Sequence, residues 1–158
     1  MSLKKGKNMK VIVDADACPV KRIIKSICNK YKVDLIFIHS ISHISEADCD
    51  VKRIIVDRVA QAADMAIVNS ANKGDIIVTS DTGLAALVLG KGCYAINPWG
   101  QIYTNTNIDI ILENRHYKQK ILASGGRIKG PPKRKSSDDV SFKDSFENLI
   151  RKFNQIDG

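Results

Sequence analysis

We expect an α/β protein of three layers, in which helices cover both faces of a mostly parallel sheet. Two observations support this expectation. Short runs of valine and isoleucine alternate with helical segments along most of the chain, which is the order of elements that builds a parallel sheet. The chain also has 158 residues, 44% of them hydrophobic, which is enough to bury the core of a single domain.

Five runs are predicted to be strands because they are short, apolar and bounded by turn residues. The predicted strands are residues 10–14, 33–39, 53–57, 76–80 and 93–97. Pro98 stops the last of them, because proline cannot continue a hydrogen-bonded strand. The run at 10–14 ends in an aspartate, the run at 53–57 does so as well, and Asp81 directly follows the run at 76–80.

Helical segments separate these strands and follow the last of them. The predicted helices are residues 20–31, 59–71, 82–89 and 108–122. A final helix is expected over 141–153, capped by Asp138 or Ser141. Its apolar stripe includes Phe142 and Phe146, so we expect it to pack back on the domain.

The domain is expected to run from residue 9 to residue 158 as one unit. Residues 1–8 are expected to be a disordered leader or an expression scar, with Met9 as the natural first residue. Residues 125–140 contain a basic segment with glycine, proline and serine pairs, which predicts a loop before the last helix.

The composition suggests a cytoplasmic protein without a membrane span. No apolar run approaches the roughly 18–20 residues that a spanning helix needs, and the basic N-terminus is not followed by an apolar stretch of signal-peptide type. The cysteines are Cys18, Cys28, Cys49 and Cys93, and they show no zinc-ligand spacing, so reduced thiols are expected. The oligomeric state is left open.

The net charge of +8 is concentrated in one region. Between Asn114 and Ser137 there is no acidic residue, and the eight bases there equal the whole excess. The candidate nucleic-acid-binding residues are Arg115, Lys118, Arg127, Lys129, Lys133, Arg134 and Lys135. This pattern predicts RNA or another polyanion as the partner. The alternative is a solvated helix face followed by a loop.

Four aspartates are the candidate metal ligands. Asp14 and Asp16 follow the first predicted strand, Asp81 follows the fourth, and Asp64 lies in the alanine-rich helix before it. Ligands of parallel sheets bind beyond the carboxyl ends of the strands, so these side chains are predicted to meet there. Clustered carboxylates repel each other, and Mg²⁺ or Mn²⁺ between them would offset that cost.

Each of these aspartates has an alternative role. Asp16, Asp57 and Asp81 could cap the helices that follow them, and Asp64 could be paired with a lysine or arginine. Cys18 is expected to be structural, since nearby carboxylates oppose a reactive thiolate.

Several other side chains bear on the site. His39, His43 and His116 are expected to face solvent. Trp99 and Tyr103 are placed in a loop after the fifth strand, where they could stack on a base or serve packing.

Three runs carry a family resemblance. V-D-A-D-A-C-P-V at 13–20, A-A-D-M-A-I at 62–67 and G-D-I-I-V-T-S-D-T-G-L-A at 74–85 resemble the YaiI/YqxD family of uncharacterised bacterial proteins. N-P-W-G-Q-I-Y at 97–103, Gly130-Pro131 and the closing helix are similar too, so the resemblance covers nearly the whole chain from Met9.

That family in turn resembles PIN-domain nucleases, which are metal-dependent RNases. The resemblance implies a PIN-like fold, with Asp14, Asp64 and Asp81 where such enzymes hold their metal and Asp16 where they often carry a polar partner. PIN enzymes usually have a further helical acid before the Asp64 position. Three acids precede it here in an irregular segment and none fits clearly: Glu46, Asp48 and Asp50.

Three functions are compatible with these residues. The first is a metal-dependent nuclease or phosphodiesterase acting on RNA, with Asp14, Asp64 and Asp81 as its catalytic residues. The second is a phosphatase similar to the haloacid dehalogenases, with Asp14 as nucleophile and Asp16 as general acid, although its late acidic pair would follow a loop here. The third is a non-catalytic RNA-binding module. Neither G-x-x-x-x-G-K-[ST] nor G-x-G-x-x-G occurs, which argues against ordinary nucleotide-dependent enzymes.

Overall fold

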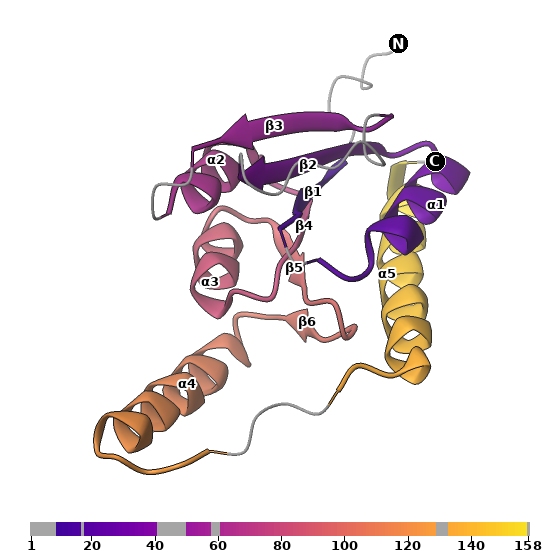
Figure 1. Ribbon diagram of the computed structural model, residues 1–158. Coiled ribbons are helices and arrows are strands. Elements are labelled where there is room, and N and C mark those ends of the chain that lie inside the picture. Colours follow the sequence, from indigo (N-terminus) through magenta and orange to yellow (C-terminus); the bar gives the residue numbers. More distant parts are fainter. Residues whose placement is uncertain (1–8, 17, 41–49, 58–60, 129–132, 158) are drawn as a thin grey trace.

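The computed structural model describes residues 9–16, 18–40, 50–57, 61–128 and 133–157. It contains a six-stranded sheet in the order β3-β2-β1-β4-β5-β6, with helices on both faces (Figure 1). The strands are β1 (Lys10–Asp14), β2 (Asp34–Ser40), β3 (Lys52–Val56), β4 (Ile76–Val78), β5 (Tyr94–Ile96) and β6 (Ile102–Tyr103). The helices are α1 (Lys21–Tyr31), α2 (Ala62–Ser70), α3 (Thr82–Gly90), α4 (Ile108–Ala123) and α5 (Ser136–Asp157). The expected three-layer α/β architecture is confirmed.

The sheet reverses its direction of growth at its centre. β1 pairs in parallel with β2 on one side and β4 on the other, so Val13 lies opposite both Phe37 and Val78. The chain therefore winds from β1 outward to β3 and then returns to place β4 against the free side of β1. In such sheets the crevice at the carboxyl ends of the two central strands is the usual ligand site. Here those strands are β1 and β4.

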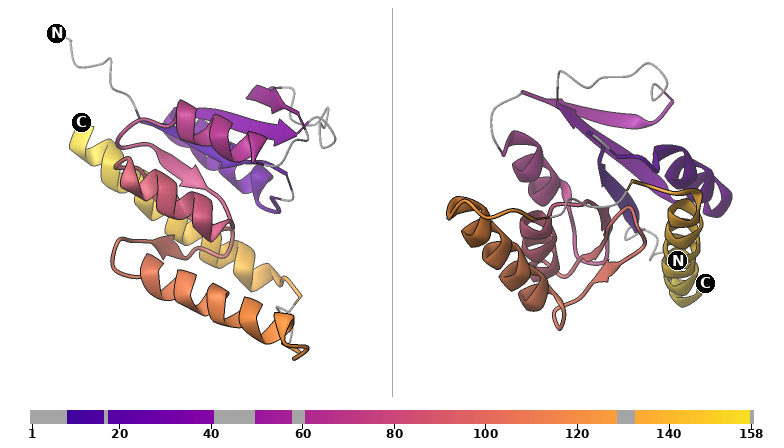
Figure 2. Two further views of the ribbon diagram at one scale, coloured as in Figure 1. Left: turned by 90° about the vertical axis from the view of Figure 1, so that its left-hand side faces the viewer. Right: turned by 60° about the horizontal axis from the view of Figure 1, so that its bottom comes forward.

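Two hydrophobic cores hold the helices to the sheet. Side chains alternate along β1, so Val11 and Val13 pack toward α1 and α5, whereas Ile12 packs toward α2 and α3. Figure 1 shows these two pairs of helices on opposite sides of the sheet. α4 packs beside α3 at the outside of the second layer (Figure 2).

The last helix begins five residues earlier than expected, at Ser136 rather than 141. Asp138 and Asp139 occupy its first turn, where carboxylates favour the positive end of the helix dipole. The Asp138 carboxylate accepts the N–H of Lys135 at 2.8 Å, whereas Ser141 lies inside the helix and is no cap. The helix does pack on the domain as expected, with Phe142 and Phe146 fully buried.

A sixth strand lies where a loop was expected. β6 pairs antiparallel with β5, and Tyr103 faces Ala95. The turn between them is held by Asn97, whose side-chain oxygen accepts the N–H groups of Trp99 and Gln101 at 2.9 and 3.0 Å. Tyr103 is only 3% exposed, so it packs in the core and is not available to stack on a base.

None of the helices in the described part of the chain is long and apolar enough to cross a lipid bilayer.

Candidate functional site

Asp14 lies at the carboxyl end of β1, directly opposite the end of β4. Its Oδ2 accepts a hydrogen bond of 3.1 Å from the hydroxyl of Thr79. The same hydroxyl oxygen accepts the N–H of Asp81 at 3.0 Å, and the N–H of Thr79 donates to the carbonyl of Ile96 at 3.0 Å. The buried Thr79 therefore ties Asp14, Asp81 and β5 into one fixed arrangement.

The carboxyl group of Asp14 is electrostatically unusual. Burial raises its pKa from 3.8 to about 6, against the lowering effect of the Thr79 hydrogen bond. The negative charges of Asp64, Asp16 and Asp81 raise it further. None of these groups that shift the pKa of Asp14 is a basic residue. The structure thus brings the other three predicted aspartates into electrostatic range of Asp14.

Asp64 lies in the first turn of α2 and is partly buried. Its pKa is raised chiefly by burial and then by the charge of Asp81. Among the described residues no lysine or arginine forms an ion pair with it, so the alternative of a basic partner is not observed there. The charge of Asp81 thus acts on both Asp64 and Asp14.

Asp81 caps α3. Its Oδ1 accepts the N–H groups of Gly83 and Leu84 at 2.9 and 3.1 Å, so the capping alternative is confirmed. A guanidinium nitrogen of Arg115 lies 4.0 Å from the same oxygen. Because both capping bonds use Oδ1, the cap does not require the second carboxylate oxygen.

Asp16 is anchored to β2. Its two carboxylate oxygens lie 3.2 and 3.1 Å from the N–H of Ser40, and Oδ1 lies 3.8 Å from Nδ1 of His39. Asp16 does not cap α1, whose N-terminus has no side-chain cap. The expectation that His39 faces solvent is wrong, because β2 is covered on both faces and the imidazole is fully buried.

These carboxylates do not form a ready cage for a metal ion. In the described ranges, no three histidine, cysteine, aspartate or glutamate side chains are gathered in a way that could hold one. Magnesium, however, keeps several waters and is usually bound through only one or two carboxylates. The donor set fits a hydrated ion on Asp14 and one neighbouring aspartate. It does not fit an ion coordinated by protein alone.

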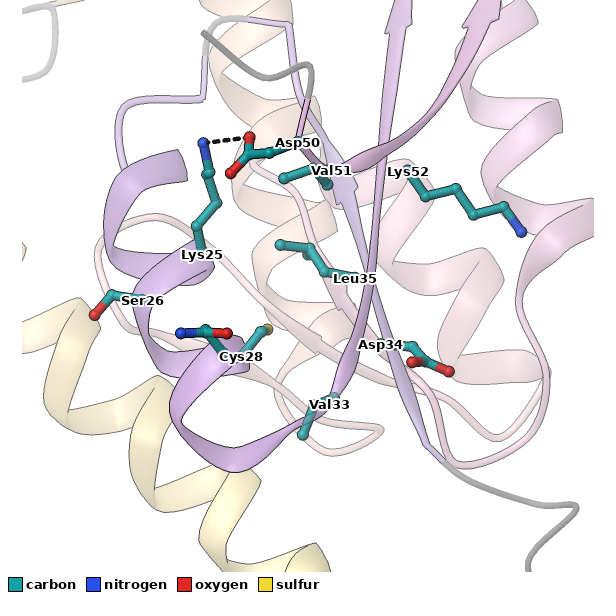
Figure 3. Close-up of a pocket in the computed structure, with 10 residues that line it drawn as sticks. Lys25, Ser26, Cys28, Val33, Asp34, Leu35, Asp50, Val51 and Lys52 are labelled. Carbon is teal, nitrogen blue, oxygen red and sulfur yellow. Dashed lines mark ion pairs between the residues drawn. The ribbon is translucent and has the colours of Figure 1, made fainter.

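The remaining candidate acids that the structure describes are not among the carboxylates that act on Asp14. Asp57 follows β3 and is exposed. Asp50 forms an ion pair of 2.9 Å with Lys25 in a separate cavity of about 540 Å³ (Figure 3). That cavity is at the start of β2 and β3, the opposite edge from Asp14, so Asp50 cannot serve as the additional acid of the site. Glu46 and Asp48 lie outside the described residues, as do His43 and Cys49.

The candidate basic residues divide into two groups. Arg115 and Lys118 are exposed on α4, and Arg127, Lys133 and Lys135 are also exposed. Arg134 is instead part of the fold: it lies 2.9 Å from Asp139, donates to the carbonyl of Pro98 at 2.8 Å, and covers the Trp99 ring at 5.4 Å. Lys129 lies outside the described residues.

The environments of the thiols favour their protonated form, chiefly through burial and only to a small extent, for Cys18, through the charge of a nearby carboxylate, the cause expected from the sequence. Burial raises the pKa of the Cys18 thiol, and it raises that of Cys28 to about 12. Both are free, and so is Cys93.

The hydrogen bonds of Thr79 to Asp14 and Asp81 were not evident from the sequence. The one signal was its position two residues before Asp81 at the end of a predicted strand, which places its hydroxyl at the same edge. Which acceptor that hydroxyl reaches depends on the pairing of β4 with β1, a contact between residues 65 positions apart.

Comparison with known proteins identifies relatives along almost the whole chain. Residues 12–152 match a family described as "Uncharacterized BCR, YaiI/YqxD family". A UPF0178 protein of Alkaliphilus metalliredigens is 48% identical over 91% of this chain and 93% of its own length. Another, of Oceanobacillus iheyensis, is 47% identical over 91% of this chain and 100% of its own. No solved structure matches the chain significantly. The chain belongs to the YaiI/YqxD family.

Proposed function

We propose that this protein binds Mg²⁺ or Mn²⁺ at its acidic edge and hydrolyses phosphodiester bonds in RNA. The observation that carries the proposal is the partly buried carboxyl group of Asp14, which lies among three further carboxylates and whose pKa is raised to about 6. Such a cluster destabilises the folded state unless a cation offsets the repulsion. Oxygen ligands of this kind select hard divalent cations.

Each aspartate would have a role that follows from the hydrogen bonds that hold it in place. Asp14 is held by Thr79 at 3.1 Å and would be the principal metal ligand, with Asp64 or Asp81 as the second. Asp16, fixed to the N–H of Ser40, would orient metal-bound water. A bound divalent ion would supply Lewis acidity and a water of lowered pKa. The likeness of Asp14 and the T-S-D run at 79–81 to the PIN-domain pattern supports this assignment.

The phosphatase alternative is less well supported. It requires a late acidic pair at a strand end. Asp138 and Asp139 lie in the first turn of α5, bonded to the N–H of Lys135 and to Arg134.

A non-catalytic RNA-binding module remains the second candidate, since exposed bases on α4 suit a polyanion without requiring metal chemistry.

The test is cleavage of a single-stranded RNA in the presence of Mn²⁺. We expect Asp14→Asn to lower the cleavage rate by more than about a hundredfold, since loss of outer-shell partners alone costs metal sites about 10–100-fold. The matched control is Asp144→Asn. Asp144 is an exposed acid on α5, which covers the face of the sheet opposite α2 and α3, and the variant should cleave RNA as wild type does. Equal cleavage by wild type and Asp14→Asn, or cleavage unaffected by a chelator, would refute the proposal.

A further inference from the structure

A cavity of about 650 Å³ adjoins the acidic edge. One wall is the turn that carries Asp81 and Thr82, and the other is a single face of α4. The volume lies within the range of about 300–1,000 Å³ that is typical of small-molecule sites. Because Asp81 belongs to both, the cavity and the carboxylate cluster are continuous.

The face of α4 that lines the cavity follows from its sequence. Ile111, Arg115, Lys118 and Leu122 recur at spacings of three and four, so they project from one side of the helix. Lys120 lies two positions from Lys118, on a different side of the helix, and does not line the cavity. Two of the three lysine and arginine side chains between 115 and 120 therefore line the cavity.

Arg115 stands at the boundary between the cavity and the carboxylates. Its Nη1 lies 3.3 Å from the hydroxyl of Thr82 and 4.0 Å from Oδ1 of Asp81. The side chain is 51% exposed, and a guanidinium has five N–H donors, so most of its donors are not used by these two contacts. Within the part of the chain that the structure describes, Lys118 forms no ion pair. Both cations are available to an anion that enters the cavity.

The cavity also has apolar surface. Leu122 is 56% exposed and lines it together with the partly buried Ile111. Cationic donors beside aliphatic side chains suit a ligand that is anionic at one end and flat and apolar at the other. A nucleotide within a single strand has this character, since its base is unstacked and accessible, whereas a duplex hides its bases from such a surface.

We infer that this cavity binds one nucleotide of a single-stranded polynucleotide, with its phosphate on Arg115 and Lys118 and its base or sugar against Ile111 and Leu122. The inference rests on the proposed function for one feature: the bound nucleotide lies next to the phosphodiester bond presented to Asp14 and Asp81. The RNA would therefore contact one face of α4, and not all of the basic residues between 115 and 135. Arg134 is excluded, because its contacts with Asp139, Pro98 and Trp99 fasten α5.

The test is binding of a fluorescently labelled single-stranded RNA of about ten nucleotides, measured by anisotropy in the presence of EDTA. Arg115→Gln should weaken binding by about tenfold and lower the slope of log affinity against log salt by about 0.7. Leu122→Ala should weaken binding a few-fold without altering that slope. Lys120→Gln removes the same charge from the same helix and should leave the affinity unchanged. All three positions are exposed, and thermal melting checks that each variant is folded.

The outcomes separate this site from the proposed hydrolysis. Equal weakening by Arg115→Gln and Lys120→Gln would overturn the inference, because it would mean diffuse attraction by a basic surface. Binding of a duplex as tightly as the single strand, or no binding by wild type, would overturn it as well. A single-stranded DNA of the same sequence separates the two sources of the ligand: equal affinity supports recognition of phosphate and base, and a preference for RNA supports an added contact to the 2′-hydroxyl. If wild type binds as expected and cleaves nothing with Mn²⁺, the hydrolysis fails and the nucleotide site stands.

Discussion

The hydroxyl of Thr79 donates to the carboxylate of Asp14 at 3.1 Å across the point where the sheet changes its direction of growth. The two residues are 65 positions apart, and each lies at the carboxyl end of a central strand. Since the same hydroxyl oxygen accepts the N–H of Asp81, this one side chain sets the position of two of the four carboxylates.

Thr79→Val should show how much the hydrogen bonds of Thr79 contribute to the stability of the protein and to the pKa of Asp14. Valine keeps the shape but removes the donor to Asp14 and leaves the N–H of Asp81 without its acceptor, at a cost of about 1–3 kcal/mol. The pKa of Asp14 should rise further, because the hydrogen bond from Thr79 lowers it. Urea denaturation and a carboxyl-carbon NMR titration measure the two effects. Thr106→Val, at an exposed turn, is the control, and equal behaviour of the two variants would contradict the account.

Asp14→Asn should stabilise the protein when no divalent metal is present. The folded-state pKa of about 6 lies above the ordinary 3.8, so the folded protein binds this proton more tightly than the unfolded chain. Wild type therefore loses stability as the pH rises from about 4 to about 6, and the loss is complete above that window. Asparagine does not ionise, so the variant avoids this loss, and its side-chain oxygen can still accept the Thr79 hydroxyl. Its free energy of unfolding should therefore exceed that of wild type by on the order of 2 kcal/mol near pH 7.

Chemical denaturation at several pH values in EDTA measures this difference, which should vanish near pH 4. Saturating Mn²⁺ should reverse the order, because it stabilises only a folded state that binds it. A variant less stable than wild type in EDTA near neutral pH would show that Asp14 is paired in a way that favours its charge.

Replacements of Asp81 should separate helix capping from metal binding. Asp81→Ala removes the acceptor for the N–H groups of Gly83 and Leu84 and should cost about 1 kcal/mol of stability. Asp81→Ser preserves a capping oxygen and should be close to neutral, yet both variants lack the carboxylate. We expect equal losses of Mn²⁺ affinity, measured by calorimetry, and unequal melting temperatures. Full metal affinity in Asp81→Ser would remove Asp81 from the ligand set.

Gly100→Ala should weaken the attachment of α5. Gly100 has a φ of +92°, and a Cβ there would lie 2.7 Å from the carbonyl oxygen of Ser141. Gly125 has a similar φ of +89° but nothing within 4 Å, so it isolates the backbone term of roughly 1 kcal/mol. Gly100→Ala should lose clearly more stability than Gly125→Ala in urea denaturation. Equal losses would mean that α5 moves away at little cost.

Periodicity was sufficient to predict most of the fold. The five predicted strands are all present to within two residues at each end, because each is a short, mostly apolar run bounded by turn residues. β6 was missed because two residues carry no pattern, and its pairing depends on the Asn97 turn. The early start of α5 was missed because its first turn, with Ser136 and Asp138, has the composition of a loop.

The site was predictable in place but not in detail. The rule that ligands bind beyond the strand ends located Asp14 and Asp81 correctly, since it needs only the order of elements. The partners of Asp14 and Asp16 could not be read from the sequence, because Thr79 and Ser40 reach them through strand register. His39 was placed wrongly for a related reason: a polar residue in a strand covered on both faces has no solvent to face. The binding of metal and RNA stays a prediction.

The most direct test is the binding of Mn²⁺ to wild type, Asp14→Asn and Asp144→Asn, measured by calorimetry across about pH 5 to pH 8. We predict one site in wild type whose affinity rises with pH up to about 6, because the ion competes with the proton on Asp14. Asp144→Asn should behave as wild type, and Asp14→Asn should lose the site. Unchanged binding by Asp14→Asn, or no binding by wild type near neutral pH, would contradict a metal centre at this edge.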